Sequence, residues 1–231
     1  MHELLQKQTC TAILGALENL PSGLPAIYSR MLLQVLAERR RTSSAILRWV
    51  TLTLRPLELQ ELAAAVGIHR SSLLITPEQA IRDEITFCGP FLKIQERKVS
   101  LAHQSARDYL LRNERDNDAV FEVFQLELEN AHLEIAQACL DCVTHSDLQH
   151  AVVDLNNRPP LLRYAALHWP GHAKNCSVQA AKLSHPARPF FQRHFPLQKH
   201  WIVTYKKIKV LDLPASLPLL CKAQGVQYLT L

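Results

Sequence analysis

The sequence has no membrane-spanning apolar run, no signal-peptide pattern at its start and no disulfide framework. No run of about 18 apolar residues occurs among the 231 residues, so no membrane-spanning helix is expected. The first ten residues, MHELLQKQTC, lack the basic-then-apolar layout of a signal peptide. Six scattered cysteines show no disulfide framework. We therefore expect a reduced, cytoplasmic protein.

Glycine is also scarce, with six residues in the whole chain, and long stretches carry apolar residues at helical spacing. The predicted fold class is mainly α. A helical pair comes first, then a winged helix with one small β-hairpin, then an α-helical domain. The three tryptophans, Trp49, Trp169 and Trp201, all lie in apolar helical contexts, and we expect them to anchor the core.

The winged helix is predicted from the order of its elements. Residues 46–54 carry a helical apolar stripe that ends before a proline, and residues 57–66 form the next helix, giving a helix-turn-helix. Residues 76–78, Thr-Pro-Glu, start a third helix. Residues 91–94 and 99–103 alternate in polarity around a charged turn, which predicts a two-stranded hairpin.

The segment VSLAHQSARDYLL, residues 99–111, contains the three residue types of a hydrolase triad, namely His103, Ser105 and Asp108. A triad also needs an oxyanion hole, and no nucleophile elbow with flanking glycines is present. We instead expect a capping box, with Ser105 as N-cap of the following helix and Asp108 reaching back to its amide. No catalytic residue is predicted.

His103 has two possible roles. Residues two apart share a face of a strand, so Val99, Leu101 and His103 are expected to point toward the core. His103 would then lie beside a helix N-terminus, where free amides and the helix dipole favour an anion such as phosphate. It could instead satisfy a hydrogen bond within the core, which the residues alone favour, although they leave both roles open.

A zinc site is the next chemistry to consider. The motif Cys139-x-x-Cys142-x-x-His145 holds three potential ligands. His132 or His150 could supply a fourth. No second Cys/His pair at finger spacing exists, and Cys139 continues the apolar stripe of its helix, which indicates a buried thiol. No metal site is predicted.

The net charge of +5 raises the possibility of nucleic-acid binding. The lysines and arginines are spread widely, and their one tight cluster, residues 39–41, is typical of a solvated helix face. The second helix of the helix-turn-helix, residues 57–66, would enter the major groove, but it carries Glu58 and Glu61 and no basic residue. We expect no nucleic-acid partner.

Several segments, in order, resemble one family, the fungal NACHT-type signalling NTPases, in the region that follows their nucleotide-binding core. They are LPAIYSRML (24–32), ILRWV (46–50), RPLxLxELA (55–63), VSLAHQSxxDYL (99–110), AHLEIAxxCL (131–140), YAAxHW (164–169) and WxxxY (201–205). Such proteins commonly carry ankyrin repeats further on. The winged-helix segment is also similar to one named after GPI inositol-deacylase, a name that implies no lipase chemistry here.

This resemblance implies that the winged helix packs against a nucleotide-binding core. The histidine matched by His103 would contact the phosphate of bound ADP and hold the resting state. The sequence itself has no G-x-x-x-x-G-K-[ST] phosphate loop and no apolar strand ending in paired acids for magnesium. We therefore expect no enzyme and no cofactor in this chain, with ADP or ATP implied for an intact relative.

The expected organisation follows from the resemblance. Residues 1–37 would be a helical segment after a missing NTPase core, 38–113 the winged helix, 114–211 the helical domain, and 212–231 a linker with a degenerate start of an ankyrin-like repeat. The chain would be a non-catalytic regulatory fragment whose winged helix is a nucleotide-state lid. The alternative is a helical protein-interaction scaffold without a nucleotide role. Expected partners are proteins or an NTPase core, with no nucleic acid and no membrane.

Overall fold

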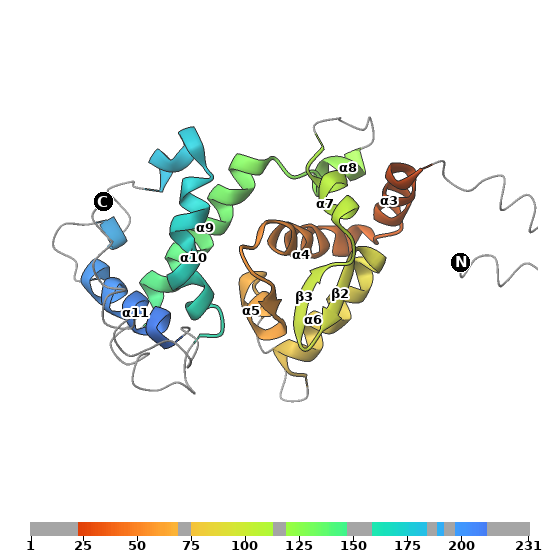
Figure 1. The fold of residues 1–231 in the computed structure, drawn as a ribbon. Coiled ribbons are helices and arrows are strands. Elements are labelled where there is room, and N and C mark those ends of the chain that lie inside the picture. The colour runs from red at the N-terminus through yellow and green to blue at the C-terminus, as the bar shows by residue number, and fades with distance from the viewer. Residues whose placement is uncertain are drawn as a thin grey trace, which may run out of the picture.

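The fold is mainly helical with one small sheet (Figure 1). The computed structural model describes residues 23–68, 75–112, 119–146, 159–183, 189–191 and 197–211. The predicted fold class, mainly α with a winged helix and a helical region, is confirmed. The first helix of the predicted helical pair lies outside the described residues. The ankyrin-like start expected at residues 212–231 lies outside the described residues. No helix in the described ranges is long and apolar enough to cross a bilayer.

The first part of the described chain is a winged helix preceded by one helix. Its elements are α3 (Leu24–Leu33), α4 (Arg40–Leu52), β1 (Leu57–Glu58), α5 (Leu59–Ala65), α6 (Pro77–Phe87), β2 (Leu92–Gln95), β3 (Lys98–Leu101), α7 (Gln104–Leu110) and α8 (Ala119–Phe124). Thr76 caps α6 by accepting from the Gln79 amide at 3.2 Å, and Pro77 follows at the first helical position. The predicted third helix is therefore confirmed.

The sheet has three antiparallel strands in the order β1-β3-β2. The predicted hairpin is β2 and β3, with Ile94 opposite Val99. The third strand, β1, was expected to be the start of a helix, and that expectation is wrong. Glu58 keeps an extended backbone and Glu61 accepts from its amide at 2.9 Å, so the helix begins at Leu59. A strand of two residues is too short to show an alternating pattern.

One hydrophobic core fills the space between these elements. Its buried side chains come from α3 and from every helix and strand of the winged helix, for example Leu32, Ile46, Leu57, Leu62, Ile81, Leu92, Val99 and Leu110. Trp49 is buried in this core at 5% exposure, as expected. The spacing of apolar residues along the sequence thus correctly identified the inward faces of α4 and α6, except that α4 ends at Leu52 and Leu54 is exposed.

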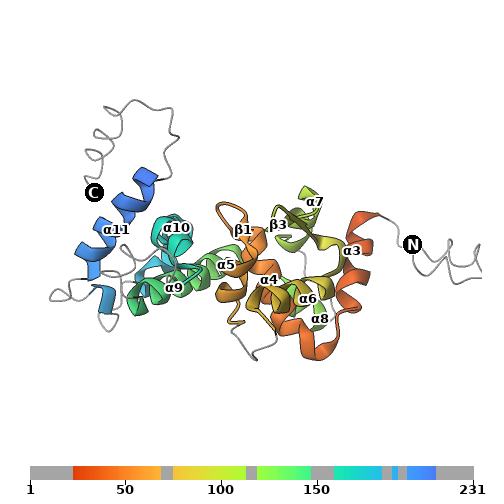
Figure 2. The same ribbon diagram turned by 90° about the horizontal axis from the view of Figure 1, so that it is seen from below.

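A second group of helices lies at the other end of the molecule (Figures 1 and 2). It consists of α9 (Leu128–His145), α10 (Leu162–Lys174) and α11 (Leu197–Leu211), and α9 packs along α10. Trp169 and Trp201 are half-buried and pack against each other with ring centroids 5.3 Å apart. Phe190 contacts both rings edge-to-face, so these tryptophans anchor α11 onto α10.

Candidate functional site

His103 lies on the surface, between the end of β3 and the start of α7. The expectation that it points into the core with Val99 and Leu101 is wrong, because the strand pairing ends at Leu101 and the alternation of faces ends with it. Val99 is fully buried and Leu101 is half-buried, whereas the His103 side chain is exposed. The core role considered for this histidine therefore does not apply.

The N-cap of α7 is His103, and the expected capping box of Ser105 and Asp108 is wrong. Nδ1 of His103 accepts a hydrogen bond from the Ser105 amide at 3.2 Å, which is the contact a serine or asparagine oxygen usually makes. Ser105 lies within the helix. Asp108 is exposed and accepts from the Gln104 side chain at 3.3 Å. The Ser-x-x-Asp pattern misled because the helix begins earlier than that pattern implied.

Three side chains form a hydrogen-bonded chain that leads from α3 to the His103 ring. The Tyr28 hydroxyl lies 2.8 Å from Oγ of Ser105, and Oγ lies 2.7 Å from Nδ1 of His103. An Nδ1 atom that accepts from a backbone N–H is unprotonated, so the neutral ring carries its proton on Nε2. The ring that carries this Nε2–H is exposed.

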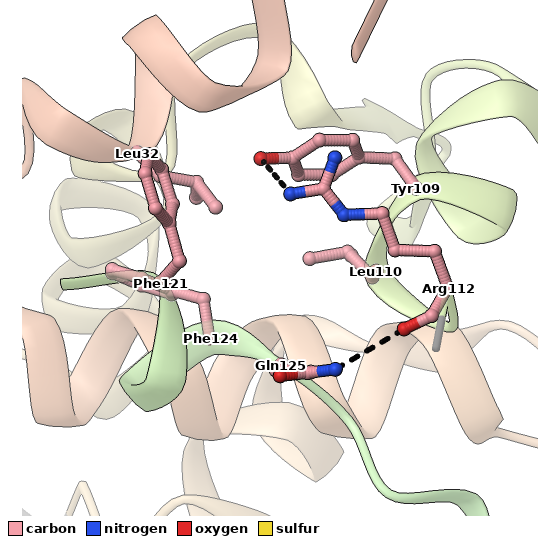
Figure 3. Close-up of a pocket in the computed structure, with 7 residues that line it drawn as sticks. All are labelled: Leu32, Tyr109, Leu110, Arg112, Phe121, Phe124 and Gln125. Carbon is pink, nitrogen blue, oxygen red and sulfur yellow. Dashed lines mark hydrogen bonds between the residues drawn. The ribbon is translucent and has the colours of Figure 1, made fainter. Parts of the chain in front are cut away.

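A second contact joins the same two helices. Oγ of Ser29 lies 2.8 Å from the Tyr109 hydroxyl, and Arg112 donates to that hydroxyl at 3.1 Å while its guanidinium lies 3.9 Å above the tyrosine ring. Figure 3 shows the hollow beside this stack, with Leu32, Phe121 and the other apolar side chains around it. Its cavity volume is about 20 Å³, which is room for one water molecule and not for a nucleotide.

A buried polar network connects the winged helix to the helical region. The Leu54 amide donates to the Tyr164 hydroxyl at 3.1 Å, and that hydroxyl lies 2.8 Å from Nε2 of His172. Nδ1 of His172 lies 2.9 Å from Nδ1 of His132 on α9. Tyr164 is fully buried and also lies under the Arg55 guanidinium, whose partner is Glu61. The network ties the loop after α4 to α9 and α10.

Burial keeps both histidines of this network neutral. It lowers the pKa of His172 to about 3, with further lowering by the neighbouring His132 and His168. It also lowers the pKa of His132, which faces the positive charge of Arg107. Burial raises the pKa of Tyr164 to about 12. Neutral rings and a protonated tyrosine can donate and accept in a single continuous chain. The sequence pattern gave no sign of this network.

Cys139 is a fully buried thiol of α9, as its place in the apolar stripe predicted, and burial raises its pKa. Cys142 is half-buried and His145 is exposed, with Nδ1 of His145 2.7 Å from the Asp141 carbonyl oxygen. In the described ranges, no three His, Cys, Asp or Glu side chains are grouped so that they could hold a metal ion. His150 lies outside those ranges.

The helix-turn-helix pair is α5 and α6, because β1 separates α4 from α5 and α5 packs against α6. The expectation that the first two helices form this pair is wrong. The helix in the recognition position is therefore α6, which carries Glu78, Asp83 and Glu84. Its one arginine, Arg82, is paired with Glu78 at 3.2 Å. Such a helix would repel DNA phosphates, and the absence of a nucleic-acid partner stays a prediction.

Comparison with known proteins shows what this part of the chain is similar to. Residues 29–122 match the family model described as the winged helix domain of GPI inositol-deacylase. These residues are similar to that winged helix domain, and the order of their helices and strands agrees with it. The resemblance found in the sequence is thereby confirmed. A winged helix domain is not itself a catalytic domain.

Two curated fungal proteins are similar to the chain. The vegetative incompatibility protein HET-E-1 of Podospora anserina is 37% identical over 118 residues, which are 49% of this chain and 9% of that protein. The azaphilone pigments biosynthesis cluster protein L of Monascus ruber is 27% identical over 215 residues, 87% of this chain and 44% of that protein. The chain thus spans less than half the length of these relatives. No solved structure matches it significantly.

Proposed function

We propose that the chain is a non-catalytic regulatory part of a NACHT-type nucleotide-gated signalling protein, in which the winged helix domain is the nucleotide-state lid. Support comes from the winged helix match and from the similarity to an incompatibility protein. The sequence lacks a phosphate loop, so the nucleotide would be held by a separate core. Partners would be that core or other proteins, and ADP or ATP would be the ligand.

The arrangement of His103 is the single observation that carries this proposal. The ring is exposed, its Nδ1 is occupied by the cap of α7, and its tautomer leaves a proton on Nε2. A neutral imidazole held in this way is a rigid donor to a phosphate oxygen, and its rotamer freedom is already lost before the nucleotide binds. A phosphate contact would thus link the nucleotide to the first turn of α7.

The Tyr28 hydrogen bond extends this link to α3. Because Ser105 contacts both Tyr28 and His103, a displacement of α3 relative to α7 would break the contact that supports the ring. The lid would then respond to the segment that precedes the winged helix. Loss of the phosphate contact would in turn release α7 from the nucleotide-binding core. The lid would then have a bound and a released state, as a switch requires.

ADP release tests the proposal in a protein that carries the nucleotide-binding core upstream of this chain. A lost hydrogen bond to a charged group corresponds to roughly 1.5–3 kcal/mol, so His103→Ala should release ADP about ten- to a hundredfold faster. The matched control is His145→Ala, which removes an exposed histidine of α9. Equal release from wild type and both variants, all folded, would refute the nucleotide role.

One observation favours the alternative, a protein-interaction scaffold without a nucleotide role. A groove of about 490 Å³ lies between α4, α5 and α9, and its lining includes Arg41, Trp49 and Ile135. The scaffold function predicts that a partner protein binds equally well to wild type and to His103→Ala. It also predicts that changes at the groove weaken this binding without altering ADP release.

A further inference from the structure

The net charge of +5 is an average over the whole chain, and one segment is much more basic than the rest. Residues 155–211 contain ten of the 26 lysines and arginines, whereas all 21 aspartates and glutamates lie outside this segment. The segment therefore carries a formal charge of +10 with its histidines neutral, and the rest of the chain carries −5. A stretch of this length without one acidic residue favours a partner of uniformly negative charge.

Helix α11 displays part of this charge on its outer face. Thr204 and Ile208 are buried toward the helical region. The exposed positions recur at spacings of three and four, so they share the opposite face. Besides Gln198, they are Lys199, Ile202, Val203, Lys206, Lys207 and Lys209. The outer face of α11, meaning these six side chains, combines four ammonium groups with two aliphatic side chains that are 41% and 49% exposed.

The direction of this face is set by packing beneath it. The Trp201 indole donates to the Ala166 carbonyl oxygen at 2.9 Å, and its ring packs against Trp169 and Phe190. These contacts hold α11 against α10. Figures 1 and 2 both place α11 at the end of the molecule farthest from α3. The outer face of α11 therefore points away from the winged helix and is accessible when that domain is engaged elsewhere.

We propose that the outer face of α11 binds the surface of an anionic phospholipid bilayer. Protein partners are usually recognised by charges of both signs, whereas this segment has only one. Nucleic-acid surfaces are usually met by arginine, amide and aromatic side chains, whereas Ile202 and Val203 lie between the lysines. Lysine stems can lie along lipid headgroups while short aliphatic side chains reach the acyl boundary.

This proposal goes beyond the nucleotide role and does not depend on it. The expectation that the chain has no membrane partner rested on the lack of a membrane-spanning run, and a helix that lies on a bilayer needs no such run. Adsorption through lysines would weaken as salt is added, because mobile ions screen the attraction.

Vesicle co-sedimentation of the full 231-residue chain tests the proposal. The anionic vesicles contain phosphatidylcholine with about one-third phosphatidylserine. Vesicles of pure phosphatidylcholine are the neutral control. The test variant is Lys199→Gln/Lys206→Gln/Lys207→Gln. Each lysine near such a surface contributes about a fivefold gain in partitioning, so the triple change should weaken binding on the order of 100-fold.

The matched control is Arg41→Gln/Lys93→Gln/Lys98→Gln, which removes three exposed charges from the winged helix and changes the net charge equally. It should bind like wild type. A second variant, Ile202→Ser/Val203→Ser, should bind more weakly with all lysines intact. Absence of binding to the anionic vesicles, equal binding to neutral vesicles, equal losses in both triple variants, or preference for single-stranded RNA would each overturn the proposal.

Discussion

At the scale of single residues, His103 has two separable tasks. Its Nδ1 caps α7, and its Nε2–H is the proposed phosphate donor. The position of this residue near a helix N-terminus was predictable from the sequence. Its exposure was not, because the alternation of faces in a strand says nothing about where the strand ends. The cap was also unpredictable, since histidine rarely takes the place of serine or asparagine.

The capping task predicts an effect on stability that is independent of nucleotide. His103→Ala should lower the free energy of unfolding by about 1 kcal/mol, because the Ser105 amide loses its acceptor. His103→Asn should lose much less, since an asparagine oxygen is a strong N-cap. Urea unfolding of the isolated chain measures both. An equal loss in the two variants would show that this cap contributes nothing.

At the scale of elements, the helices and the hairpin follow from sequence periodicity, and the details of the turns do not. The hairpin turn is formed by Glu96 and Arg97, which have φ angles of 49° and 65°. Tight two-residue turns favour glycine or asparagine there, so a charged pair at these positions gave no turn signal. The hairpin was predicted from the alternation on both sides of the turn, and the strand β1 was missed because it has only two residues.

The left-handed backbone of Arg97 predicts that glycine is more stable than alanine at this position. Arg97→Gly should be more stable than Arg97→Ala by about 1 kcal/mol, because only glycine adopts a positive φ without a steric penalty. Both variants lose the same surface ion pair to Glu78, so the comparison isolates the backbone. Urea unfolding of the two variants is the measurement. A more stable alanine variant would show that the turn is not strained.

At the scale of the whole molecule, the winged helix and the helical region meet at the buried network of Tyr164, His172 and His132. No sequence pattern predicted this network. His132 and His172 are 40 positions apart, and they meet only because α9 packs along α10. The apolar stripes predicted both helices. They could not predict which polar residues would face each other inside the contact, because that depends on the rotation of each helix about its axis.

This network predicts loss of stability in acid. The pKa of His172 is about 3 in the folded chain and 6.5 without burial, so between these values only the unfolded chain binds the proton. The free energy of unfolding should therefore fall as the pH drops below about 6.5, with a slope of up to about 1.4 kcal/mol per pH unit for one proton. The depressed pKa of His132 adds to this slope.

Urea unfolding between about pH 7.5 and about pH 5 measures the slope. His172→Gln should flatten it, whatever that change does to stability at neutral pH. His145→Gln, at an exposed position of α9, should leave it unchanged. A wild-type stability that stays constant over this range would mean that the histidine pair is accessible to protons in the folded chain.

The most direct measurement of the central claim is the ring ¹⁵N spectrum of His103 in a protein that carries the nucleotide-binding core. The account predicts that Nδ1 keeps the shift of an unprotonated acceptor with and without ADP, because it caps α7 in both states. Added ADP should shift the protonated Nε2 resonance, and His145 should not respond. An unchanged Nε2 resonance at saturating ADP would contradict the claim that His103 reads the nucleotide phosphate.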